Sequence, residues 1–149
     1  AIYAVIDSRL GDAAGRRALV VITDGVDNGS RIQMEKMIEL AQQHQTTIYA
    51  IGLRLPPNEL PIQEPSQRKA VKVLEKISEE TGGSFFQVRK ANDIETAFRK
   101  IADYLLGSYV LAFRPADQSS GGGIHRIRVE TTRRDAVVLF QRGYYAPVR

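Results

Sequence analysis

The stretch ALVVITDGVDNGS, residues 18–30, decides the fold class of this chain. Residues 18–23 form a continuous apolar run that is β-branched towards its end and closes with Thr23. Such a run predicts a strand that is buried on both faces, as in a parallel sheet. Asp24 and Gly25 follow, and residues of these types end strands by forming turns. We therefore expect a parallel strand that ends at Thr23 and continues through a polar loop.

The segments around this stretch alternate between helical and extended patterns. Ser30 with Gln33, and Asn92 with Glu95, have the spacing of a capping box at a helix start. Residues 54–66 hold four of the six prolines, which predicts an irregular loop. The expected elements are a short helix over 2–10, a helix after Ser30, a strand over 46–53, a helix over 67–81, a strand over 84–88 and a helix from Asn92. Helices between successive strands predict an α/β fold with a parallel sheet and flanking helices.

The last third of the chain has a different pattern. Strand candidates are Tyr109–Arg114, Ile124–Thr131 and Ala136–Gln141, and no helical segment separates them. Glycines 121–123 and residues 133–135 supply turns, so we predict an antiparallel β-meander. The expected organisation is an α/β part over 1–107 and a β extension over 108–149, packed on the same domain.

Length and composition exclude several classes of protein. The chain has 149 residues, of which 43% are hydrophobic and 26% charged, as in an ordinary globular domain. No apolar run approaches the roughly 20 residues of a membrane-spanning helix. Cysteine is absent, which excludes disulfides and thiolate metal sites. The two histidines, His44 and His125, lie far apart in sequence and do not indicate a metal site.

The positive charge gathers in the tail. Residues 1–98 carry 12 basic and 13 acidic side chains, whereas residues 99–149 carry 9 and 4. A nucleic-acid surface is one interpretation. Because the arginines alternate along a strand with Glu130 among them, we favour a solvated strand face and expect no nucleic-acid partner. These arginines are Arg114, Arg126, Arg128, Arg133, Arg134, Arg142 and Arg149.

The loop that follows the first buried strand holds the candidate site residues. They are Thr23, Asp24, Gly25, Asp27, Asn28 and Ser30. Ligands of open α/β sheets bind at the carboxyl ends of the strands, and carboxylate, amide and hydroxyl oxygens suit Mg²⁺ or Ca²⁺. A turn without a ligand explains the same residue types. A third interpretation is a hydrolytic pair of Asp24 and Asp27, although no nucleophile or phosphate-loop motif accompanies it.

The order of these parts resembles a von Willebrand factor type A domain. The resemblance is carried by ALVVITDGVDNGS, TTIYAIGL, EETGGSFFQV and NDIETAFRKIADYL, and the ending GYYAP is similar to bacterial VWFA-related proteins. It implies a Rossmann-like fold and a metal-ion-dependent adhesion site. Of that site only Asp24 can be matched, because the chain has no Asp-x-Ser-x-Ser motif. We expect a domain that lacks its amino-terminal strands, with no cofactor of its own, whereas the complete domain would hold Mg²⁺ or Ca²⁺.

The resemblance also implies a function and a location. The expected function is a non-enzymatic protein-binding or adhesion module of an exported bacterial protein, located in the periplasm or outside the cell. Its partner is unknown, and the chain has no catalytic residues under this hypothesis. The chain shows no signal peptide at Ala1, so an export signal would lie outside it.

The strand over 18–23 suggests an alternative role. Without a neighbour on its outer side, this apolar strand is an edge that can pair with another chain. We expect either a homodimer through this edge or an edge that the carboxyl-terminal meander covers. The protein would then be an assembly element that needs no metal.

Overall fold

A computed structural model of the chain describes residues 2–10, 15–23, 33–53, 65–113 and 123–145. The elements in chain order are α1 (Ile2–Val5), the π-helical turn η1 (Ile6–Leu10), β1 (Arg17–Thr23), α2 (Met34–Gln43), β2 (Thr46–Leu53), α3 (Pro65–Glu80), β3 (Phe85–Val88), α4 (Ala91–Leu106), β4 (Ile124–Arg126) and β5 (Gly143–Tyr145). Among these, no helix has the length and apolar character that crossing a membrane requires.

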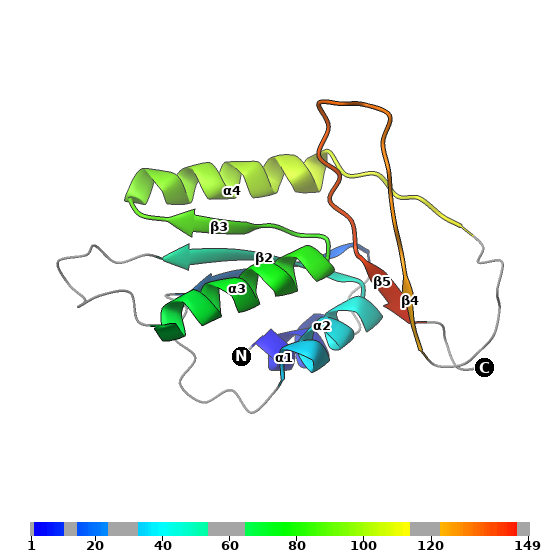
Figure 1. The fold of residues 1–149 in the computed structure, drawn as a ribbon, viewed down its shortest axis with the longest axis horizontal. Coiled ribbons are helices and arrows are strands. Elements are labelled where there is room, and N and C mark those ends of the chain that lie inside the picture. The colour runs from blue at the N-terminus through cyan, green and yellow to red at the C-terminus, as the bar shows by residue number, and fades with distance from the viewer. Residues whose placement is uncertain (1, 11–14, 24–32, 54–64, 114–122, 146–149) are drawn as a thin grey trace.

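The three central strands form one parallel sheet in the order β1-β2-β3. Both pairings are parallel because a helix returns the chain to the same end of the sheet each time. This confirms the predicted α/β class. Figure 1 shows α4 on one face of the sheet and α1, α2 and α3 on the other.

Each face of the sheet has its own apolar core. On the side of α2 and α3 the buried residues are Ile6, Ile38, Leu40, Ala41, Ile48 and Ile77. On the side of α4 they are Tyr49, Ile51, Val88, Ala97 and Ile101. The central strand β2 is therefore largely buried, whereas no residue of β1 is fully buried. β1 is therefore an edge strand of the sheet, even though its sequence is apolar along most of its length, as is typical of a strand buried on both faces.

The two predicted capping boxes were misplaced. The structure begins α2 at Met34 with Gln33 at the N-cap, and Ser30 lies outside the described residues. It begins α4 at Ala91 with Lys90 at the N-cap, so Asn92 lies inside the helix. At α4 the physical reason is that Asp93, and not Glu95, reaches back to the free backbone N–H groups before the helix. At α2 the N-cap Gln33 makes no side-chain cap hydrogen bond.

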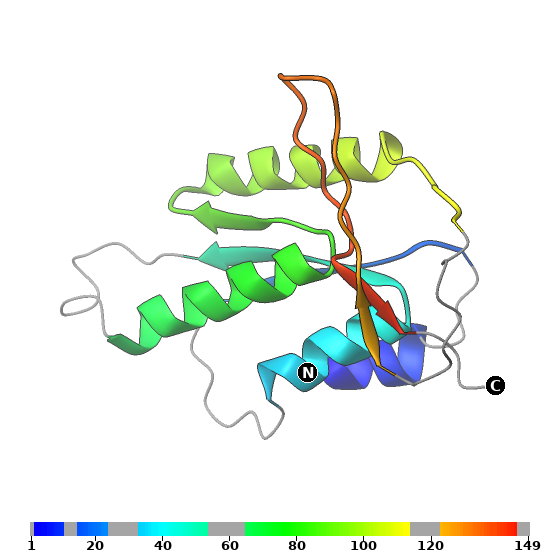
Figure 2. The ribbon, with the colours of Figure 1, turned by 45° about the vertical axis from the view of Figure 1, so that its right-hand side comes forward.

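The predicted β-meander was wrong in extent. Within the described part of the tail, only β4 and β5 pair as strands, in an antiparallel two-stranded sheet. Residues 109–113 and 127–141 form no strand, although Gln141 makes a single antiparallel bridge to Thr81. In Figures 1 and 2 the two arms beyond this pair project past α4. A two-stranded ribbon without a packed face is only marginally stable in water, so strand pairing is limited to β4 and β5. Arg114 lies outside the described residues.

The described part of the tail, residues 124–145, is called the tail hairpin below. It packs at the amino ends of the strands: Arg142 N–H donates to the Glu80 carbonyl at 3.1 Å, and Gln141 Nε2 to the Gln42 carbonyl at 3.1 Å. It forms a sheet of its own and does not pair with β1. The expectation that the tail covers the outer edge of β1 is therefore wrong for these residues.

Candidate functional site

The carboxyl ends of the three parallel strands lie along one edge of the sheet. Thr23 is in register with Gly52, and Leu53 is in register with Val88. This carboxyl edge is the side of an open α/β sheet where ligands bind. It faces away from the tail hairpin (Figure 1).

Thr23 is the predicted site residue that the structure describes. It is the last residue of β1 and is half-buried at the carboxyl edge. Asp24, Gly25, Asp27, Asn28 and Ser30 lie outside the described residues, so their roles stay predictions. The loop that holds them starts at the carboxyl edge, because β1 ends there.

Asp93 organises the end of the carboxyl edge where β3 turns into α4. One of its oxygens, Oδ2, accepts hydrogen bonds from the backbone N–H groups of Arg89 and Lys90, each at 3.0 Å. These two bonds hold the pKa of Asp93 below its ordinary value of 3.8, because they favour the charged carboxylate. The negative charge also lies at the helix N-terminus, where the helix dipole is favourable.

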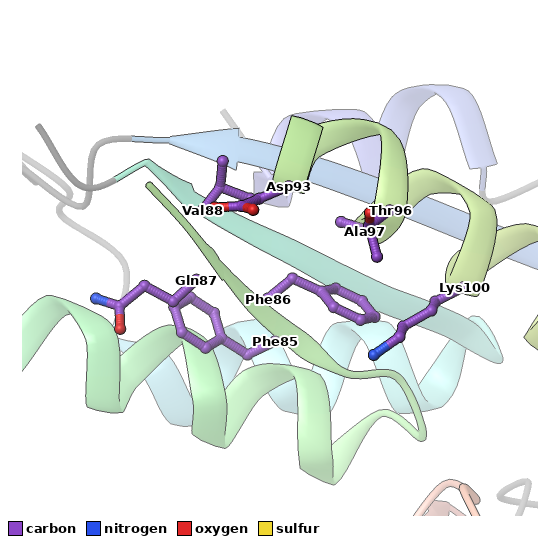
Figure 3. A pocket seen from close by; sticks show the side chains of 8 residues that line it. All are labelled: Phe85, Phe86, Gln87, Val88, Asp93, Thr96, Ala97 and Lys100. Atoms are coloured by element: carbon purple, nitrogen blue, oxygen red, sulfur yellow. The ribbon is translucent and has the colours of Figure 1, made fainter. Parts of the chain in front are cut away.

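A groove of about 340 Å³ runs between β3 and α4. We call it the β3–α4 groove, and Figure 3 shows the residues that line it. They are Phe85, Phe86, Gln87, Val88, Asp93, Thr96, Ala97 and Lys100. This groove was not predicted from the sequence. The sequence pattern that points to it is a stripe of small or polar residues on one face of a helix, formed by Asp93, Thr96, Ala97 and Lys100.

Metal and acid–base chemistry have little support in the described residues. Within them, no group of three or more His, Asp or Glu side chains could hold a metal ion. His44 caps the carboxyl end of α2, and the His125 ring stacks on Tyr144 at 5.0 Å between centroids. The proposed hydrolytic pair, Asp24 and Asp27, lies outside the described part of the chain.

An ion pair between the buried carboxylate of Glu80 and the exposed Arg126 fastens the tail hairpin to α3. Glu80 is only 7% exposed, and its carboxylate accepts from Arg126 at 2.7 Å and pairs with Lys76 at 3.3 Å. Burial alone raises the pKa of Glu80, but the hydrogen bonds from Arg126 and Lys76 outweigh it, so the pKa lies below its ordinary value of 4.5. Arg142 also pairs with Glu79. Arg126 stays mostly exposed, as expected for a solvated strand face, while its guanidinium reaches the buried Glu80 carboxylate.

Comparison with known proteins identifies the α/β part. The model of the von Willebrand factor type A domain family matches residues 1–100. Among curated proteins, no relative matches the chain. A solved structure with a similar arrangement is an uncharacterized membrane spanning protein from Vibrio fischeri, at 19% sequence identity and a TM-score of 0.49. The similarity covers 64% of this chain and 48% of that one, so this chain spans about half of its length.

Proposed function

Because the chain belongs to the von Willebrand factor type A domain family, we propose that it is a non-enzymatic protein-binding module of an exported bacterial protein. The observation that carries the proposal is the position of Thr23 at the carboxyl edge of the sheet. The loop that starts at Asp24 leaves from this edge, where open α/β sheets bind their ligands. We assign binding to this loop, and we regard residues 1–107 as the module and residues 108–149 as an extension packed on it.

The metal site of this module is incomplete in our proposal. Asp24 is the one residue of this chain that matches the family's site, and Mg²⁺ or Ca²⁺ needs several oxygen ligands with one or more carboxylates. The described residues add no carboxylate cluster that would complete it. The donor set therefore does not fit a resident divalent ion, and partner binding by this chain would not depend on one.

Partner binding is expected to depend on the loop. Three proteins would be immobilised and incubated with bacterial envelope extract. They are wild type, the loop double variant Asp24→Ala/Asp27→Ala, and the control Asp103→Ala, which lies on the exposed surface of α4. Quantitative mass spectrometry should find a protein that wild type and Asp103→Ala retain and the loop variant loses, by about tenfold or more. A partner retained equally by all three variants would contradict the assignment of binding to this loop.

A metal titration distinguishes partner binding without a divalent ion from partner binding through a metal site that the chain assembles. Calorimetric titration of the chain with Mg²⁺ and Mn²⁺ should show no binding, and the partner should stay bound in EDTA. A dissociation constant of about 1 mM or tighter that Asp24→Ala abolishes would show that the chain assembles a metal site.

A second candidate function is assembly through the outer edge of β1. The specific observation is that Ile22 is 51% exposed although it is apolar and in register with Ile51, which is 0% exposed. An apolar edge of this kind favours pairing with another chain. The assembly would be a homodimer that needs no metal.

Self-association is expected to respond to a charge on this edge. Light scattering during gel filtration should show a dimer for wild type and a monomer for Ile22→Lys, because an edge lysine opposes strand pairing. The matched control is Leu106→Lys, which adds the same charge at an exposed apolar position on α4. A wild-type monomer with rapid amide exchange throughout residues 18–23 would contradict the assembly hypothesis.

A further inference from the structure

The outer edge of β3 has no strand partner among the residues that the structure describes. β3 lies at the end of the strand order, and its described pairing is with β2 alone. Ala50 N–H donates to the Ser84 carbonyl at 3.1 Å, and Ala50 is in register with Phe85. In a parallel ladder of this register the N–H and C=O groups of Phe85 and Gln87 point away from β2. These four groups face the open side of the sheet.

A helical wall runs along this edge. Asp93, Thr96, Ala97 and Lys100 all line the β3–α4 groove, and their spacing places them on one face of α4. The four residues of β3 form the other wall. Figure 3 shows Asp93 beside Val88 and Lys100 near Phe86, so α4 runs back along the strand. An edge strand beside a helix is the arrangement in which an extended peptide adds to a sheet.

The groove combines an apolar floor with a cationic end. Val88 and Ala97 are buried, and the half-buried Phe86 ring points towards the α4 side in Figure 3. At one end the Asp93 carboxylate is held by the N–H groups of Arg89 and Lys90. At the other end the exposed Lys100 joins none of the ion pairs found in the described ranges. Charge complementarity therefore favours an acidic group beside Lys100.

We infer that the β3–α4 groove binds an extended peptide as an additional strand of the sheet. The peptide backbone pairs with Phe85 and Gln87, alternate apolar side chains cover Phe86 and Ala97, and an acidic side chain lies beside Lys100. Because Lys100 lies towards the amino end of β3, an acidic residue at the carboxyl end of the peptide sets it antiparallel to β3. This site lies at β3, at the opposite end of the strand order from β1, and goes beyond the proposed function.

The test uses a defined probe, the fluorescein-labelled peptide VTVTE with a carboxyl-terminal amide. Its first, third and fifth side chains share one face, which presents two valines and one glutamate to the groove. Fluorescence anisotropy would measure its affinity for wild type, Lys100→Glu and the matched control Lys72→Glu on the exposed surface of α3. We expect Lys100→Glu to weaken binding about tenfold and Lys72→Glu to change it less than about twofold.

Two modified probes separate the parts of the inference. VTVTQ should bind several-fold more weakly than VTVTE, with the difference lost in Lys100→Glu. A version N-methylated at the amides whose N–H groups face β3 should not bind, because that edge of the peptide can no longer pair with the strand. In ¹⁵N-resolved spectra the VTVTE probe should shift the amide signals of residues 85–88 and 93–100.

Four results would overturn the inference. Three are absence of VTVTE binding at about 1 mM probe, equal binding to wild type and Lys100→Glu, and amide shifts confined to the edge of β1. The fourth is retained binding of the N-methylated probe, which would show that the peptide does not pair as a strand. Asp24→Ala should bind the probe as wild type does. The peptide test therefore does not depend on whether the proposed function of the loop is correct.

Discussion

Gly83→Ala is expected to remove at least about 3 kcal/mol from the free energy of unfolding. Gly83 is buried in the turn between α3 and β3, and a Cβ there would lie 2.0 Å from the carbonyl oxygen of Ile48. The clash is with the backbone of the central strand, which no rotamer change relieves. The turn would have to move, which would strain the 3.1 Å hydrogen bond from Ile48 N–H to Thr81 Oγ1.

Urea unfolding followed by circular dichroism would measure this loss. The control is Gly107→Ala at the end of α4, where an added Cβ would meet only the Asp103 carbonyl oxygen, at 3.0 Å. We expect the control to change stability by about 1 kcal/mol or less. If Gly83→Ala stayed within about 1 kcal/mol of wild type, the close approach of this turn to β2 would be refuted.

Ile51→Ala is expected to cost about 2–5 kcal/mol, since truncating a buried isoleucine loses apolar contact and leaves a cavity. Ile51 is 0% exposed and packs in the core between the sheet and α4. Its neighbour in register, Ile22, is 51% exposed. The same truncation at Ile22 should cost less than about 1 kcal/mol, because little apolar area is lost.

The pair of variants also reports on the edge of β1. Thermal or urea unfolding at low protein concentration should show a clearly larger loss of unfolding free energy for Ile51→Ala than for Ile22→Ala. Equal losses of about 2–5 kcal/mol would mean that another surface covers Ile22 in solution, which would favour the assembly hypothesis. Losses below about 1 kcal/mol for both variants would contradict the core that the structure assigns to this face.

The sheet was predictable from the sequence because its strands are long apolar runs. Residues 18–23 and 46–53 are rich in apolar and β-branched residues and hold no charged residue, and both form strands, as does Phe85–Val88. Apolar runs separated by amphipathic helices leave few arrangements other than a parallel sheet. The starts of α2 and α4 were not predictable, because several polar residues near each start could serve as the cap.

The tail was less predictable because strand propensity needs a partner. The segment Tyr109–Phe113 has the composition of a strand, yet Tyr109 is 92% exposed and Phe113 touches the tail hairpin through the Tyr144 ring, with the ring centroids 5.6 Å apart. β-propensity describes how a residue fits a pleated and partly buried surface. Which segment receives such a surface depends on the rest of the fold.

The sequence by itself determined the fold class and the position of Thr23 at the end of the first parallel strand, because run length and periodicity are local properties of the chain. Only the tertiary structure decided that the buried Glu80 pairs with Arg126, a residue 46 positions away. The same holds for the β3–α4 groove, which exists because α4 returns along the free edge of β3. Such features depend on which distant side chains and backbone edges are brought together, and packing and charge pairing settle that in three dimensions.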